Sequence, residues 1–184
     1  NLIKARERLL VAVPVALLLI FVLLYFTFKS IKQSVLIFTA IPLSAIGGIF
    51  ALYMRDMPFS ISAGVGFIAL AGVAVEIGVI MLVYLNKSYK EMLDQCTAES
   101  SKPNLEQLKE VVNEGAGMRV RPVMMTAASI IVGLLPILLG TGTGSEIMSR
   151  IAAPMVGGMA SALLLTLLVI PAIFYLWKKK SLDL

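Results

Sequence analysis

The chain has 184 residues, of which 59% are hydrophobic and 15% charged, and it carries a net charge of +5 with no histidine. Soluble globular domains are typically about 45–50% apolar and about a quarter charged, so this composition excludes an ordinary soluble domain. One cysteine and no histidine also exclude a disulfide framework, a Cys/His metal cluster and a hydrolase built on a nucleophile–histidine pair.

Long apolar stretches follow one another along the chain and predict an all-α integral membrane protein. Each stretch is long enough to cross a bilayer core of about 30 Å as a helix. After a polar lead-in at 1–8, one membrane domain is expected over 9–184, with a cytoplasmic loop at 86–121. Within it we expect five spans, at about 9–28, 35–54, 64–85, 122–139 and 147–177.

The polar loop between the third and fourth spans contains a helix signal of its own. Asn104 precedes Gln107 by three residues, which is the spacing of a capping box. Leu108 and Val112 then fall on one helical face, and Gly115 fits a C-cap. These features predict a short amphipathic helix that lies on the surface of the membrane or of the bundle.

Small residues and prolines indicate where the spans approach one another or bend. Gly72 and Gly78 would let neighbouring helices pack closely. Pro136 is expected to break the fourth span, and Pro154 lies within the fifth. Ser145 can cap the start of the fifth helix.

The distribution of basic residues predicts the orientation of the chain in the membrane. Eleven of its sixteen Lys and Arg residues fall in the first loop, the third loop and the carboxyl-terminal end. The positive-inside rule places these segments in the cytoplasm, so the amino terminus lies outside. No signal segment precedes that terminus, and we therefore expect a fragment whose upstream part is missing.

Glu76 is the only acidic residue within a predicted span. A charged carboxylate at that depth costs about 2.5 kcal/mol or more unless it faces protein or water. It could hold helices together by bonding to a Ser or Thr. Alternatively it could carry protons, because a carboxyl in apolar surroundings can exchange them near neutral pH. No Lys or Arg of this chain lies deep enough to pair with it.

Two further groups could serve transport or merely support packing. The Thr126 hydroxyl, about one turn into the fourth span, could join a proton relay or bond back to its own helix. Met148, Met155 and Met159 follow a spacing of i, i+7 and i+11, which forms one helical stripe. Such a stripe is often core packing, but thioethers also select soft ions such as Cu(I).

Three motifs resemble the heavy-metal-efflux branch of the RND pumps, of the CusA/SilA/CzcA type, and most resemble its copper/silver members. They are GFIALAGVAVEIGVIMLVYL at 66–85, MRVRPVMMT at 118–126 and GLLPILLGTGTGSEIMSRIAAPMVGGM at 133–159. The resemblance covers nearly the whole chain and implies the last five membrane helices of a proton/metal antiporter. It implies that Glu76 and Thr126 belong to the proton relay and that Met148 belongs to the metal path.

The resemblance also implies a secondary active transporter rather than an enzyme, in the inner membrane of a Gram-negative bacterium. Its cargo would be Cu(I) or Ag(I) together with protons, with no tightly bound cofactor. Expected partners are membrane lipid, the missing amino-terminal half, a homotrimer, a periplasmic adaptor and an outer-membrane channel, but no nucleic acid. One departure is Val123, which stands where copper/silver pumps carry a lysine. The relay then runs on acids and hydroxyls alone, or its cation lies in the missing half.

Two alternatives remain open at the level of sequence. The chain could belong to an RND exporter of organic compounds or lipids, against which the Met148 region argues. It could also be a non-transporting membrane scaffold or sensor in which Glu76 only fixes helix packing.

Overall fold

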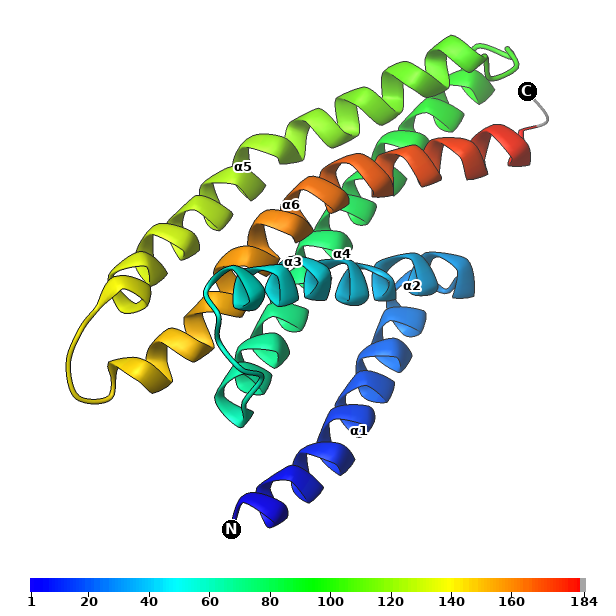
Figure 1. Ribbon diagram of the computed structural model, residues 1–184. Coiled ribbons are helices and arrows are strands. Elements are labelled where there is room, and N and C mark those ends of the chain that lie inside the picture. Colours follow the sequence, from blue (N-terminus) through cyan, green and yellow to red (C-terminus); the bar gives the residue numbers. More distant parts are fainter. Residues whose placement is uncertain (183–184) are drawn as a thin grey trace.

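A computed structural model describes residues 1–182, and all regular secondary structure in that range is α-helical (Figure 1). The last two residues of the predicted domain, 183 and 184, lie outside the described residues. Because α2 and α3 form one apolar stretch, the described residues contain five segments able to cross a membrane, which confirms the all-α membrane fold. The helices are α1 (Leu2–Phe28), α2 (Ile31–Phe38), α3 (Ala40–Met54), α4 (Ile61–Ala98), α5 (Leu105–Leu139) and α6 (Ser145–Ser181).

The third span is longer than its apolar stretch predicts. Helix α4 begins after Ser60, whose side chain accepts a hydrogen bond from the Ala63 N–H at 3.3 Å, and it continues to Ala98. Its 38 residues extend for about 57 Å, well beyond a bilayer core of about 30 Å. The helix continues because 86–98 contains no glycine or proline, while Met92 and Cys96 remain buried on its inner side.

The prediction of a separate amphipathic helix is wrong, because those residues are the first part of the long helix α5. It starts at the predicted capping box, where the Asn104 N–H donates to Gln107 Oε1 at 3.1 Å. It then runs to Leu139 without ending at Gly115. A Cβ at Gly115 would lie 3.1 Å from Ser88 Oγ, so this glycine allows α4 and α5 to approach and does not terminate the helix. Residues 86–121 therefore form a polar hairpin of two helices rather than a loop.

Two expected helix ends are also wrong. Pro136 does not break the fourth span, because α5 continues through it to Leu139. A proline removes one backbone hydrogen bond, and a membrane helix tolerates this loss when the freed groups are satisfied locally. The residue that caps α6 is Gly144, with a φ of 86°, a conformation that favours glycine. Ser145 is the first helical residue, and its hydroxyl donates to the Gly142 carbonyl at 2.7 Å.

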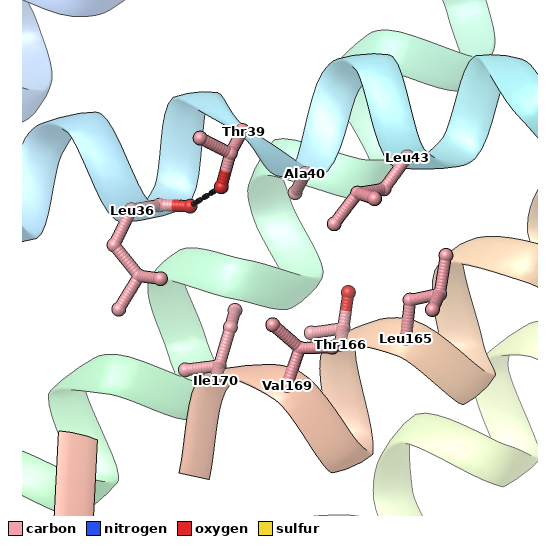
Figure 2. A pocket seen from close by; sticks show the side chains of 8 residues that line it. All are labelled: Leu36, Thr39, Ala40, Leu43, Leu165, Thr166, Val169 and Ile170. Carbon is pink, nitrogen blue, oxygen red and sulfur yellow. Dashed lines mark hydrogen bonds between the residues drawn. The ribbon is translucent and has the colours of Figure 1, made fainter. Parts of the chain in front are cut away.

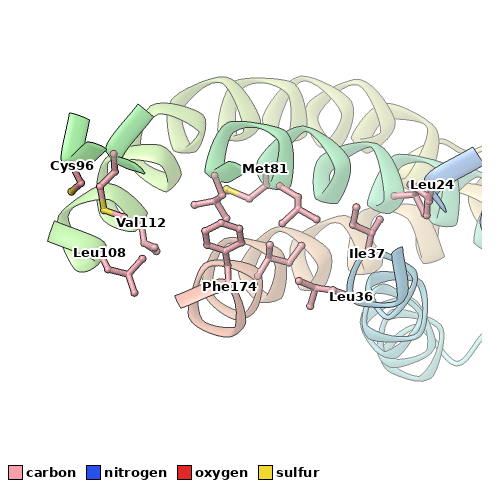
Figure 3. Close-up of a cluster of buried hydrophobic side chains, with 13 residues drawn as sticks. Leu24, Leu36, Ile37, Met81, Cys96, Leu108, Val112 and Phe174 are labelled. Atoms are coloured by element: carbon pink, nitrogen blue, oxygen red, sulfur yellow. The ribbon is translucent and has the colours of Figure 1, made fainter. Parts of the chain in front are cut away.

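Helix α4 is the centre of the hydrophobic core. Figure 3 shows the largest buried cluster following α4 from Leu24 and Ile37, through Met81 and Phe174, to Cys96 in the polar hairpin. Helices α4, α5 and α6 pack side by side, whereas α1 packs mainly against α2 and stays largely exposed (Figure 1). The chain therefore forms a bundle with two long central helices, α4 and α6.

Helices α3 and α6 cross with their backbones in close contact. A Cβ added at Gly47 would lie 2.5 Å from the Gly157 carbonyl oxygen, and one added at Gly157 would lie 2.6 Å from the Gly47 carbonyl oxygen. Small residues allow this approach between membrane helices, where packing and interhelical hydrogen bonds replace the hydrophobic effect. The crossing fixes the middle of α3 against α6, about a third of the way along α6.

Candidate functional site

Glu76 lies on the side of α4 that the other helices of residues 1–182 leave exposed. The opposite side of α4 is filled by buried residues such as Leu70, Ile77 and Met81. We expected the carboxylate inside the bundle, but those apolar residues occupy the inner side, and the Glu76 side chain is exposed. The exposed face of α4 is defined by Val65, Ile68, Gly72, Glu76 and Val83.

This exposed face is apolar except for its one carboxylate. A charged group facing acyl chains is costly, so such residues in membrane helices almost always face protein or a water-filled cavity. No group of three or more Asp, Glu, His or Cys side chains gathers at Glu76 or elsewhere in residues 1–182. Among residues 1–182, therefore, no acidic cluster accompanies the carboxylate on this face.

Thr126 lies on α5, and its side chain is also exposed. Its hydroxyl donates to the Pro122 carbonyl at 3.0 Å, which is the backbone-bonded arrangement common for threonine in membrane helices. That bond occupies the carbonyl four residues back and leaves the oxygen free to accept a further hydrogen bond.

Val123 is buried where α4, α5 and α6 meet. It is 3% exposed and packs in one cluster with Leu70, Ile77 and Met159. Ile77 directly follows Glu76 along α4, so Val123 lies next to the helix segment that carries the carboxylate. The apolar residue here fills a packed junction and supplies no charge to a relay.

The four predicted packing and hinge residues lie in different surroundings. Gly72 lies on the exposed face of α4, and a Cβ there would have no neighbour within 4 Å. At Gly78 the same atom would be in ordinary contact, at 3.5 Å, with side chains of α2 and α6. Pro154 is buried within α6 and its carbonyl faces Gly48, whereas Pro136 is exposed on α5.

Met148 lies on the first turn of α6, and 57% of its surface is exposed. The helix ends around it are held together through one carbonyl. Arg55 Nη2 donates to the Leu138 carbonyl at 3.2 Å, and Ser149 Oγ donates to the same oxygen at 3.5 Å. This carbonyl belongs to the last turn of α5, where intrahelical donors are missing. Arg55 and Ser149 thus fix the position of the α6 end that presents Met148.

The methionine stripe is divided between surface and core. Met159 is fully buried in the cluster with Leu70, whereas Met148 is exposed. A Cβ at Gly66 would lie 3.2 Å from the Ile151 carbonyl carbon, which aligns this turn of α6 with the start of α4. From that alignment, Met148 and Glu76 are separated by about 20 Å along the helix axes, at 1.5 Å per residue. The structure does not bring the metal candidate and the proton candidate together.

Sequence reasoning missed a set of hydroxyl and amide groups inside the bundle. Ser161 Oγ donates to the Leu43 carbonyl at 2.9 Å, which joins α6 to α3. The side chains of Gln33 and Asn86 bond to each other and join α2 to α4. Polar residues within or beside apolar spans were the available signal, because such residues commonly bond across helices.

A multi-pass helical bundle with one carboxylate on a membrane-facing helix is an arrangement typical of membrane transport proteins. Comparison with known proteins identifies the family. It belongs to the AcrB/AcrD/AcrF family, which it matches over residues 1–178.

Among its relatives, the cation efflux system protein CusA of Escherichia coli (strain K12) is 47% identical over 173 residues, which cover 94% of this chain and 16% of the relative. The cobalt-zinc-cadmium resistance protein CzcA of Cupriavidus metallidurans is 43% identical over 180 residues, 98% of this chain and 16% of the relative. A crystal structure of a heavy metal efflux pump matches with a TM-score of 0.81 and 41% identity, covering 97% of this chain and 16% of that one. The chain therefore spans about one sixth of the length of these relatives.

Proposed function

We propose that this chain is the carboxyl-terminal membrane part of a proton-driven heavy-metal exporter and that Glu76 carries its protons. The observation that carries the proposal is the carboxylate in the middle of the exposed face of α4. Nothing in residues 1–182 covers that face, and membership of an efflux family supplies the reason for a titratable group at that depth. The whole protein is then a secondary active transporter of a bacterial inner membrane, and not an enzyme.

The mechanism follows from the cost of charge in an apolar environment. When Glu76 is ionised, it requires a cation or water from the segment that covers α4. Protonation removes that requirement and lets the two surfaces pack differently. Each proton that moves down a potential of 100 mV supplies about 2.3 kcal/mol, which is enough to shift a two-state equilibrium by a useful factor.

The proposed cargo is a soft cation, Cu(I) or Ag(I). The exposed thioether of Met148, at the end of α6, is the residue that supports this choice. A single thioether is not a complete site, so its partner must come from the rest of the pump. The CzcA relative is named for cobalt, zinc and cadmium, which makes divalent ions the alternative. We propose that the complete pump is a homotrimer that works with a periplasmic adaptor and an outer-membrane channel.

The function is tested by metal resistance of cells that express the full-length pump. Glu76→Gln should abolish resistance at unchanged membrane expression, because the amide keeps the shape of the side chain but cannot titrate. Glu76→Asp should retain part of the activity. The matched control is Glu114→Gln, which removes an exposed acid of the polar hairpin. Wild-type resistance in the Glu76→Gln strain would overturn the proposal.

A further inference from the structure

A narrow crevice lies between α3 and α6, near the break that separates α2 from α3. Figure 2 shows its lining side chains, which are mostly apolar apart from Thr39 and Thr166. The crevice has room for about one water molecule. The size limits an occupant to water, provided that enough polar atoms face it.

Helices α3 and α6 contact each other directly at successive turns, but within the described residues the direct contact is missing at this crevice. At the first contact Gly47 and Gly157 touch through their backbones. One turn toward the crevice, Ser161 Oγ donates directly to the Leu43 carbonyl at 2.9 Å. One further turn along α3, the corresponding residue is Thr39, and no direct hydrogen bond joins it to α6 among residues 1–182.

Thr166 supplies an unpaired hydroxyl at this level. Only 3% of its surface is exposed, and Figure 2 shows its oxygen pointing across the crevice toward α3. The hydroxyls of Thr27, Thr97 and Thr126 donate to the carbonyl four residues earlier. Thr166 makes no such bond and has no hydrogen-bond partner within residues 1–182. Its oxygen faces the crevice, so a water bound there would supply the hydrogen bond that the protein does not.

Thr39 offers the second set of polar atoms. Its hydroxyl donates to the Leu36 carbonyl, as drawn in Figure 2, and therefore keeps free lone pairs. Its own carbonyl accepts from the Leu43 N–H at a long 3.4 Å and can accept a further bond. Pro42 has no N–H to donate, so the backbone around Thr39 is already short of hydrogen bonds.

We propose that a water molecule binds in this crevice and bridges the Thr166 hydroxyl to the oxygens of Thr39. With the Thr166 hydroxyl on one side and the Thr39 hydroxyl on the other, the water has two partners, which is within the range found for buried waters. The bridge completes the series of α3–α6 contacts that begins at Gly47. It also lies where the second span changes neighbours, because α2 is tied to α4 through Gln33 and Asn86, whereas α3 is tied to α6.

The test is X-ray radiolytic footprinting with mass spectrometry on the full-length pump that carries this chain. A bound water yields hydroxyl radicals in place, so it labels buried side chains beside it. Leu36 and Ile170, which line the crevice and are 4% and 2% exposed, should be labelled clearly above Leu70, a core residue that is 1% exposed. Labelling of Leu36 and Ile170 at the level of Leu70 in the wild-type pump would overturn the proposal.

Two threonine variants and a control separate the bridge from general solvent access. Thr166→Val keeps the shape but removes the hydroxyl, and it should reduce the labelling of Leu36 and Ile170 to the Leu70 level. Thr166→Ser should preserve the labelling. The control Thr27→Val removes an exposed hydroxyl of α1 and should change nothing. Unchanged labelling in a folded Thr166→Val pump would also contradict the bridge. If that variant fails to fold, the wild-type labelling alone decides the matter.

Discussion

The side-chain amides of Gln33 and Asn86 form a reciprocal pair between two membrane spans. Gln33 Nε2 donates to Asn86 Oδ1 at 3.1 Å, and Asn86 Nδ2 donates to Gln33 Oε1 at 3.2 Å. Gln33 lies on the first turns of α2, and Asn86 lies where α4 leaves its apolar stretch and enters the polar hairpin. The pair therefore fixes the position of α2 against the helix that carries Glu76.

The stability losses caused by replacing Gln33 and Asn86 should not be additive. Asn86→Ala or Gln33→Ala leaves a part-buried amide unpaired, which costs about 1–2 kcal/mol of stability. The double variant should lose less than the sum of the single losses, with a coupling of about 0.5–1.5 kcal/mol. Thermal unfolding of the four purified pumps in detergent measures this cycle. Strictly additive losses would show that the two amides do not act as a pair.

Gly157 should not tolerate even one added methyl group. In Gly157→Ala the new Cβ would lie 2.6 Å from the Gly47 carbonyl oxygen, which is backbone and cannot rotate away. The resulting strain should lower stability by about 1–3 kcal/mol. Gly133→Ala is the control with the opposite sign, because its Cβ would meet open space on α5 and alanine favours helix by up to about 1 kcal/mol. Equal melting temperatures for the two variants would contradict the α3–α6 crossing.

The tip of the polar hairpin should depend on Gln107. Its Oε1 accepts from the Asn104 N–H at 3.1 Å and from Cys96 Sγ at 3.6 Å, so it joins the start of α5 to the end of α4. Gln107→Ala should weaken this end by about 1 kcal/mol and speed proteolytic cleavage between the two helices. Lys109→Ala is the matched control, because Lys109 lies two residues further along α5 and is also exposed. Unchanged cleavage in Gln107→Ala would show that the cap contributes nothing to the hairpin.

Met148 should determine which metals the full-length pump removes. Met148→Leu keeps the volume but replaces the thioether, so resistance to copper and silver should fall while tolerance of zinc is unchanged. Met125→Leu is the control, because Met125 is 62% exposed on α5, close to the 57% of Met148. Equal loss for soft and divalent ions would assign Met148 to packing and favour the divalent alternative.

The apolar stretches were sufficient to predict the number of spans and the all-α fold, because a run of that length has few other stable solutions in a membrane. The helix ends were harder. A glycine at position 115 is typical of a C-cap, but in the structure Gly115 allows Ser88 of α4 to approach α5. The role of this glycine depends on a contact between helices, which a local sequence pattern does not reveal.

The candidate site was predictable in its residues but not in its geometry. Glu76 was identified because a carboxylate within a span is rare and costly. Its direction depends on which side of α4 is filled by Leu70 and Ile77, and periodicity in an almost uniformly apolar helix does not reveal that side. The Ser161 hydrogen bond and the position of Thr166 in the crevice depend on a crossing that only the fold defines.

Proton flux in liposomes shows whether Glu76 takes up and releases protons as metal moves. The full-length pump is reconstituted with a pH-sensitive dye inside, and a metal gradient is imposed at zero potential. We predict that the wild-type pump moves protons against the metal, that Glu76→Gln moves none, and that Glu114→Gln behaves as wild type. Proton movement of wild-type size in the Glu76→Gln pump would show that Glu76 does not carry the protons.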